Sequence, residues 1–159
     1  MGKSHERAPV TTGFERATRI GQGFHSDFKG PFTVPTPAGH IYFLTVIDDC
    51  SGRVFAWLCK STSEWLPIWT NFVTRVEAEL GRPNCVSWIL CDNGGVYISK
   101  EMAAFCERKG IQLRHSAPYS QWQNHTAERN MRTIGEMALT TMIHANFPRA
   151  AWGWAFMHA

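Results

Sequence analysis

The strongest constraint on the fold is the order of its segments: three strand-like segments come first, and helical and strand-like segments alternate after them. The first three are rich in β-branched and aromatic residues and cover 24–32, 40–47 and 53–59. Turn-forming residues separate them, with Pro31, Pro35, Pro37 and Gly39 in the first connection and Asp48-Asp49-Cys50-Ser51-Gly52 in the second. These residue types predict strands joined by turns, the second turn closing a hairpin.

The remaining hundred or so residues alternate between the two patterns. A helix is predicted over residues 63–80. It begins at Ser63-Glu64, its apolar residues recur at helical spacing, and Gly81-Arg82-Pro83 directly after it stops it. Further along we expect a strand over 86–91, a helix over 99–109, a strand over 111–114, a long helix over 124–146 and a last helix from residue 148 to the end of the chain. The order β-β-β-α-β-α-β-α-α predicts an α/β domain with a five-stranded mixed β-sheet flanked by helices on both faces.

The helix over 63–80 carries a continuous apolar face. Its members recur at helical spacing: Trp65, Trp69, Phe72, Val73, Val76 and Leu80. Packing in the core is the interpretation that such a stripe favours. A dimer surface is the alternative.

Length and composition indicate a folded domain with a hydrophobic core. A chain of 159 residues buries roughly 70% of its unfolded surface. The hydrophobic content of 44% and aromatic content of 13% indicate a real core. We expect one domain over 21–159, truncated at its C-terminus, after an irregular linker over 1–20. The net charge of +3 permits nucleic-acid binding without predicting it.

The five cysteines are an odd number with no C-x-x-C spacing, which indicates reduced intracellular thiols and not a zinc site. The seven histidines show no H-x-x-x-H pair either. No apolar run approaches the twenty or so residues of a membrane span. Residues 1–6 lead into no apolar stretch, so no secretory signal is predicted.

Three carboxylates stand in short distinctive motifs. Asp27 lies in His25-Ser26-Asp27-Phe28-Lys29-Gly30-Pro31, and Asp92 follows the strand-like run 86–91 and precedes Gly94-Gly95. Glu128 closes Gln123-Asn124-His125-Thr126-Ala127-Glu128, in the opening turns of the long helix. Sixty-four residues separate the first two carboxylates and thirty-five separate the second and third. The spacing alone is weak evidence, and the flanking motifs give it weight.

Together these motifs resemble the D,D-35-E triad of retroviral and retrotransposon integrases, most closely the catalytic core of copia-type retrotransposon integrases. The resemblance covers nearly the whole chain and implies an RNase H-like fold. It implies that Asp27, Asp92 and Glu128 are both the catalytic residues and the metal ligands. The implied cofactors are two Mg²⁺ or Mn²⁺ ions, and the implied partner is double-stranded DNA, from the element ends and from the target. In this family pattern, Asp27 bridges the ions, Asp92 holds one and Glu128 the other.

These residue types suit that chemistry. A pair of divalent ions about 3.5–4 Å apart activates the attacking oxygen and stabilises the leaving oxygen of a phosphodiester. Mg²⁺ prefers oxygen ligands and keeps several waters, so three carboxylates are enough protein ligands.

Five residues near Glu128 are candidate DNA contacts. Arg129 and Arg132 lie on the same helix, where phosphate binding and a Glu128–Arg132 ion pair are equally good interpretations of Arg132. Gln123 and Asn124 match the family's Gln-Asn, although Asn124 is better explained as a helix cap. Trp122 could stack on a base or pack on the protein.

The loop before this helix departs from the family pattern. Gln121, Trp122 and His125 replace the family's Pro, Gln and Gly, and Val96 replaces an acid. The triad itself is intact. With these departures, a domesticated integrase with weakened activity stays an open alternative.

Asp48 and Asp49 are a further acidic pair. Turn formation explains them better than metal binding, because Asp readily bonds to nearby backbone in turns. The resembling family also excludes this pair from its triad.

The sequence therefore predicts a metal-dependent DNA-cutting and DNA-joining enzyme, a polynucleotidyl transferase that inserts retroelement DNA and has endonuclease activity. A hydrolytic nuclease of the same superfold is an alternative, and a non-catalytic or domesticated module for assembly or DNA binding is another. We expect weak activity from the isolated chain and a homodimer formed through the 65–80 helix and the aromatic residues near 152–156. The expected location is the nucleus or a virus-like particle.

Overall fold

The computed structural model describes residues 15–91, 97, 99–115 and 125–159, with side chains from residue 129 onward in the last range. Five strands form one mixed sheet in the order β3-β2-β1-β4-β5. They are β1 (Gly23–Lys29), β2 (Tyr42–Asp48), β3 (Val54–Cys59), β4 (Trp88–Cys91) and β5 (Gln112–His115). β1, β2 and β3 pair antiparallel, whereas β4 and β5 continue the sheet in parallel. The expected mixed sheet is confirmed.

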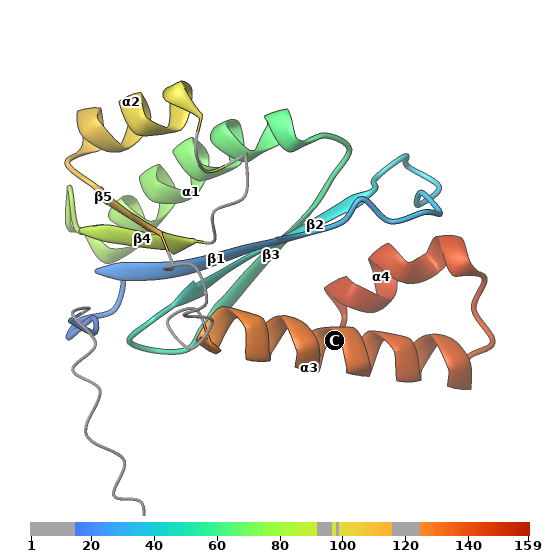
Figure 1. Cartoon of the computed structure of the whole chain (residues 1–159). Helices are drawn as coiled ribbons and strands as arrows, with labels where there is room; N and C mark the ends of the chain where they lie inside the picture. The colour runs from blue at the N-terminus through green and yellow to red at the C-terminus, as the bar shows by residue number, and fades with distance from the viewer. Residues whose placement is uncertain (1–14, 92–96, 98, 116–124) are drawn as a thin grey trace, which may run out of the picture.

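Helices cover both faces of this sheet (Figure 1). On one face lie α1 (Trp65–Leu80), preceded by the 3-10 turn η1 (Thr62–Glu64), and α2 (Lys100–Lys109). On the other face lie α3 (His125–His144) and α4 (Trp152–Met157), which follows the 3-10 turn η3 (Arg149–Ala151). Within the described residues, no helix is long and apolar enough to cross a bilayer.

Local signals in the sequence account for the helix ends. The Ser61 and Glu64 side chains form a capping box at the start of η1, and Ser99 accepts a hydrogen bond from the Met102 amide at the start of α2. Gly81 and Gly110 end α1 and α2 in the left-handed conformation that glycine adopts without strain.

β1 ends at Lys29, three residues before the predicted end. Gly30 has a φ of +133°, and a Cβ at this position would lie 2.6 Å from the carbonyl oxygen of Ile41. The chain therefore leaves the ladder here, at a place that only glycine occupies without strain. The other element boundaries lie within two residues of the predictions, except that the last helix is shorter and is preceded by η3.

The larger core cluster lies between the sheet and the helices α1 and α2. The apolar stripe of α1 belongs to it, since Trp65, Trp69, Phe72 and Val73 are at most 3% exposed. Phe24 of β1 meets Phe72 edge-on, with the ring centroids 5.0 Å apart. The core interpretation of the stripe is thus correct. The expectation that this face forms a dimer surface is wrong, because the protein's own sheet covers it.

A second, smaller cluster fixes α3 and α4 to the opposite face. Trp152 stacks on Phe32 at a centroid distance of 4.1 Å, and its indole nitrogen donates a 2.7 Å hydrogen bond to the Val34 carbonyl. Phe43 of β2 and Met131 of α3 complete the buried centre. This cluster determines where α3 lies on the sheet, and α3 is the helix that carries Glu128.

The five cysteines are free thiols. Burial raises the pKa of Cys59 and of Cys106 to about 11. Both thiols are therefore uncharged at neutral pH and serve as small apolar side chains.

Candidate active site

Asp27 lies near the middle of the sheet, on its central strand β1. It pairs in register with Thr45 of β2, and its half-buried side chain accepts a 2.9 Å hydrogen bond from the Phe28 amide. Side chains alternate along a strand, so His25, Asp27 and Lys29 share one face. Phe43, the register partner of Lys29, packs with Met131 of α3, which shows that this face is the one that α3 covers.

The other two members of the predicted triad are only partly described. Asp92 lies outside the described residues, directly after the last residue of β4. Glu128 belongs to the first turns of α3, whereas its side chain lies outside the described part. The structure thus places the elements next to these two residues, and α3 packs against β1 and β2.

The predicted DNA contacts divide in the same way. Arg129 and Arg132 are exposed residues of α3. Trp122, Gln123 and Asn124 lie outside the described residues. Their predicted roles therefore stay predictions.

Two polar contacts involve residues next to the predicted triad in the sequence, and sequence reasoning did not identify either. The hydroxyl oxygens of Ser26 and Tyr97 lie 2.9 Å apart, with both side chains almost fully buried. Tyr97 is the first described residue after Asp92, so this contact ties the chain after Asp92 to the strand that carries Asp27. At the neighbouring strand ends, Cys91 Sγ lies 3.7 Å from His115 Nδ1.

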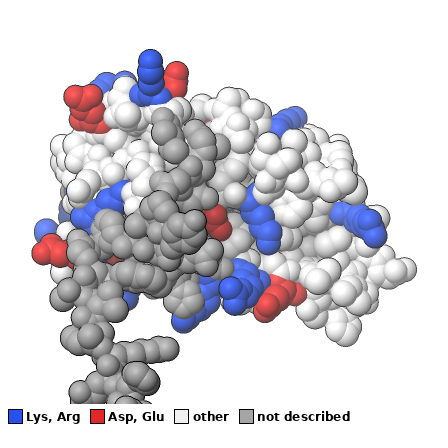
Figure 2. Space-filling model, in the orientation of Figure 1, with Lys and Arg blue, Asp and Glu red and all other residues white. Residues whose placement is uncertain are grey.

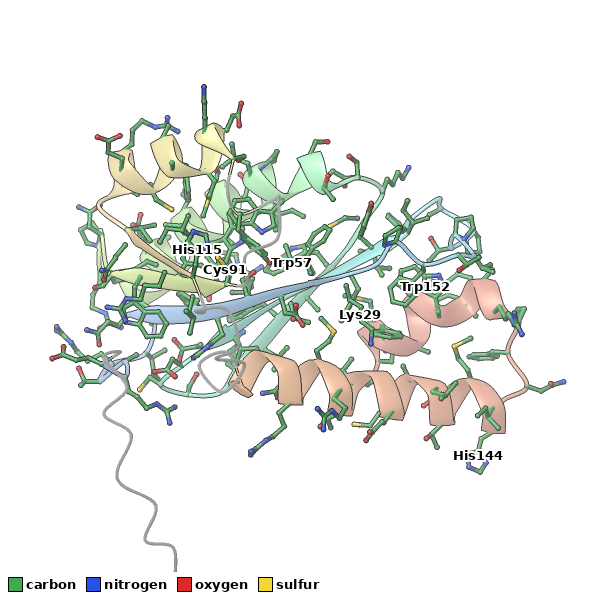
Figure 3. The ribbon with its side chains drawn as sticks, in the orientation of Figure 1. Lys29, Trp57, Cys91, His115, His144 and Trp152 are labelled. Atoms are coloured by element: carbon green, nitrogen blue, oxygen red, sulfur yellow. The ribbon has the colours of Figure 1, made fainter. Side chains whose placement is uncertain are left out.

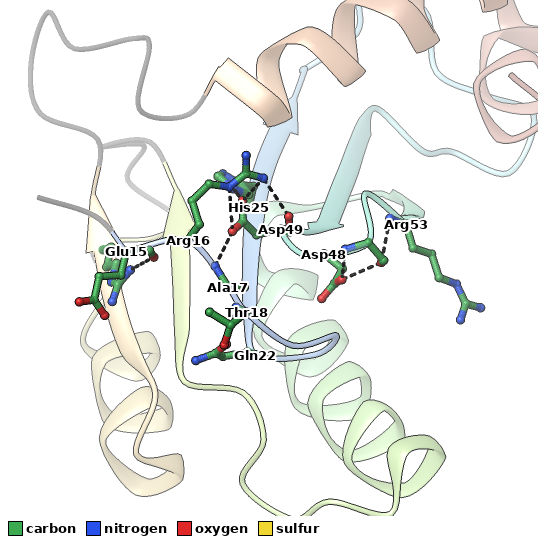
Figure 4. A network of polar contacts seen from close by, with 11 residues as sticks. Glu15, Arg16, Ala17, Thr18, Gln22, His25, Asp48, Asp49 and Arg53 are labelled. Atoms are coloured by element: carbon green, nitrogen blue, oxygen red, sulfur yellow. Dashed lines mark hydrogen bonds and ion pairs between the residues drawn. The ribbon is translucent and has the colours of Figure 1, made fainter. Parts of the chain in front are cut away.

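The acidic pair at the hairpin has two different roles. Asp48 is a turn residue, as predicted: its carboxylate accepts hydrogen bonds from the Ser51 amide and hydroxyl and from the Gly21 amide. Asp49 instead holds the segment before β1, because it accepts hydrogen bonds from the Ala17 amide (2.7 Å) and from Arg16 (3.1 Å) (Figure 4). Asp49 also bonds to His25, with Oδ1 2.9 Å from the ring Nε2.

The electrostatics of Asp49 follow from these contacts. Burial acts to raise the pKa of this carboxyl, yet the hydrogen bonds from His25, Ala17 and Arg16 outweigh it and hold the pKa below its ordinary value of 3.8. Asp49 is therefore a charged structural group at neutral pH. Hydrogen-bond donors of the protein already occupy its carboxylate oxygens, so its role is structural and not metal binding.

The carboxylate oxygens of the predicted triad are suitable ligands for divalent ions. Among the described residues, no three His, Cys, Asp or Glu side chains gather into a metal-binding group. Asp92 and the Glu128 side chain fall outside that set, so the triad contributes only Asp27 to it. Asp27 offers a half-buried oxygen ligand on a rigid strand, and carboxylate oxygens are the ligands that Mg²⁺ prefers.

The sheet order, the two helix layers and an acidic residue on the central strand define an α/β domain of the integrase-core class. The sequence profile described as "Integrase core domain" matches residues 17–121. The chain belongs to the integrase core domain family. It is 33% identical, over all 159 of its residues, to the retrovirus-related Pol polyprotein from transposon TNT 1-94 of Nicotiana tabacum. It spans only 12% of that polyprotein's length. The predicted retrotransposon integrase core is therefore confirmed.

Solved structures confirm the RNase H-like fold. The chain superposes on a simian T-cell lymphotropic virus intasome, solved in complex with PP2A regulatory subunit B56 gamma. The TM-score is 0.66 at 22% identity, and the match covers 89% of this chain and 49% of the other. The HTLV-2 integrase catalytic core domain in complex with magnesium (dimeric form) gives a TM-score of 0.57 at 18% identity, covering 89% and 87%.

Proposed function

We propose that this chain is the metal-dependent DNA-cutting and DNA-joining core of a retroelement integrase. The observation that carries the proposal is the convergence of three elements. Asp27 projects from the central strand, β4 ends one residue before Asp92, and α3 lies against the Asp27 face with Glu128 in its first turns. β1 and β4 are parallel and paired, and their last pair is His25 with Leu90. Asp27 follows His25 by two residues in β1, and Asp92 follows Leu90 by two residues in the sequence, directly after the end of β4.

In this proposal the three carboxylates hold two Mg²⁺ or Mn²⁺ ions. These ions, when bound, activate the attacking oxygen and stabilise the leaving 3′-oxygen. Asp27, Asp92 and Glu128 contribute negative charge. Asp27 lies on a strand and Glu128 on a helix, and such elements hold a site more rigidly than loops do. The HTLV-2 core domain was solved in complex with magnesium, which supports this choice of ion.

A branched DNA substrate tests the proposal. It carries a free 3′-hydroxyl that can be rejoined, so a core that needs few other DNA contacts can act on it. With Mn²⁺ we expect slow joining of the 3′-hydroxyl to the opposite strand and none with EDTA. The joining should decrease as the salt concentration rises, because salt weakens the phosphate contacts that supply most of the affinity. Sequencing gels that resolve rejoined strands from hydrolysed strands provide the measurement.

The products separate the alternatives. Hydrolysed ends without any rejoined strand would make the chain a nuclease of the same superfold. A chain that binds DNA, yet shows neither product and no thermal response to Mn²⁺, would be a non-catalytic module.

We further propose that the chain forms a homodimer. The apolar surface that remains for it lies along α3 and α4, where exposed side chains include Ile143 (68% exposed), Leu139 (58%) and Trp154 (56%). Trp152 and Phe156, from the aromatic group expected at the interface, pack instead into the second cluster. The dimeric form of the HTLV-2 core supports the proposal.

Replacing Trp154 with Asp tests the dimer. We expect the parent to sediment as a dimer at high micromolar concentration and the variant to sediment as a monomer, because a buried unpaired charge strongly disfavours association. Exchanging the exposed Thr74 of α1 for Asp is the matched control. A parent chain that sediments strictly as a monomer at this concentration contradicts the proposal.

A further inference from the structure

A hollow of about 400 Å³ opens beside the proposed active site, and Lys29 forms part of its wall. It lies between the end of β1, α3 and α4. The polar side chains of Arg132 and Glu136 line it from α3 beside Gly135, and the rest of its wall is apolar: Leu139, Met142, Trp152 and Phe156. Figure 3 shows Lys29 between β1 and the two helices.

The hollow has two cations at its rim that the described part of the protein does not neutralise. Lys29 and Arg132 are both exposed. Among the described residues, neither forms an ion pair with a carboxylate, although Glu136 lines the same hollow. Figure 2 shows basic side chains along the α3 side of the molecule, next to the residues that are not described. Two cations on one rim attract an anion.

Gly135 of α3 lies next to the lysine. A Cβ at this position would make an ordinary contact of 3.6 Å with the Lys29 ammonium nitrogen, so that ammonium lies directly over the surface of α3. Arg132 is three residues away on the same helix, and residues three apart lie on one helix face. Lys29 and Arg132 therefore approach the same side of α3 from two different elements.

Each cation lies on the same element as a triad carboxylate and only a few residues after it. Lys29 follows Asp27 by two residues on the same face of β1, about 7 Å along the strand. Arg132 follows Glu128 by four residues on α3, about 6 Å along the helix axis. A polyanion that presents one phosphate to the carboxylates therefore brings the next phosphate of the same strand toward the two cations.

We propose that Lys29, together with Arg132, binds the DNA phosphate adjacent to the one that is cut, and so positions the strand for the reaction. This inference rests on the proposed function and assigns a role to a residue that the triad does not include. Lys29 is a positioning residue: it holds the strand, and the three carboxylates carry the chemistry.

The first test is the salt dependence of DNA binding for Lys29→Ala, measured by fluorescence anisotropy with a labelled branched DNA. We expect roughly fivefold weaker binding at low salt, and a slope of log affinity against log salt that falls by about one, as for the loss of one phosphate contact. Lys29→Arg should restore both values, because arginine also binds phosphate. Lys100→Ala, on the opposite face at the start of α2, is the matched control and should bind as the parent does.

A second test keeps Lys29 and neutralises its positive charge with a carboxylate introduced on α3. Gly135→Glu places a carboxylate within reach of the Lys29 ammonium, so we expect weaker DNA binding with a reduced salt slope. Thr133→Glu adds the same charge to an exposed position two residues away on α3, which faces another direction. We expect this control to weaken binding far less than Gly135→Glu.

The results separate this inference from the function on which it rests. If Lys29→Ala keeps the parent's affinity and salt slope while Asp27→Asn loses activity, the role of Lys29 is wrong and the proposed function stands. The same conclusion follows if Gly135→Glu and Thr133→Glu weaken binding equally. If the parent chain neither binds nor rejoins branched DNA, both proposals fail. Thermal melting of each variant shows whether its fold is intact.

Discussion

Replacing Glu128 with Gln is expected to abolish DNA cutting and joining and to leave the fold intact. Glutamine has the same shape but no charge, so it binds a divalent ion poorly. Losing metal-dependent stabilisation of about 4 kcal/mol in the transition state corresponds to a rate decrease of roughly 10³-fold. The branched-DNA assay with Mn²⁺ measures the loss, and Asp27→Asn and Asp92→Asn should behave in the same way.

The same variant has a signature in thermal melting. Three converging carboxylates repel one another in the absence of metal, which favours their protonated forms. Removing one charge should therefore leave the melting temperature without metal unchanged or slightly raised. It should also reduce the increase in melting temperature that Mn²⁺ produces, because a ligand that binds more weakly stabilises the folded state less. Parent-like cleavage by Glu128→Gln would show that the triad assignment is wrong.

Replacing Asp49 with Ala is expected to lower the free energy of unfolding by about 3 kcal/mol, as for removal of one partner from a buried charged network. Asp49 is 6% exposed, and its carboxylate accepts hydrogen bonds from the Ala17 amide, Arg16 and His25. Urea unfolding at pH 7 measures the change. Asp49→Asn keeps the size and one acceptor oxygen, so it should lose less stability and retain DNA chemistry, unlike Asp27→Asn.

The stabilising effect of Asp49 should also depend on pH in a defined direction. Its pKa in the folded protein lies below the ordinary value of 3.8. The carboxylate therefore contributes its full stability above the unfolded-state pKa, and the contribution disappears as the pH falls through the folded-state pKa. We expect the stability difference between parent and Asp49→Asn to be constant from pH 7 to about 5 and to shrink below pH 4. A difference that grows in acid would contradict this role.

Local patterns were sufficient to predict most of the fold. Strands and helices followed from alternation, helical spacing and end signals such as Ser99, Gly81 and Gly110, because these act over a few residues. The apolar stripe of α1 shows what such local patterns cannot predict. Helical spacing showed that Trp65 and Trp69 share a face, whereas only the position of α1 against the sheet decided that this face is buried within the chain.

The candidate site was predicted as a set of residue types and not as a set of contacts. Asp27 was identified from its motif. The role of Asp49 depends on Arg16 and Ala17, more than thirty residues earlier in the chain, and no local pattern records that partnership. Lys29 stands in the same motif as Asp27, yet its relation to Gly135 appears only once α3 is placed on the sheet.

The indole of Trp152 reaches across 118 positions of the sequence to the Val34 carbonyl. Bringing two points so far apart together costs about 4 kcal/mol of chain entropy on a loop-closure estimate. One hydrogen bond contributes only about 1 kcal/mol. The stacking on Phe32 and the burial of Phe43 and Met131 must therefore supply the rest. α4 thus helps to hold α3 against the sheet, and the position of the helix that carries Glu128 depends in part on residues that are synthesised after it.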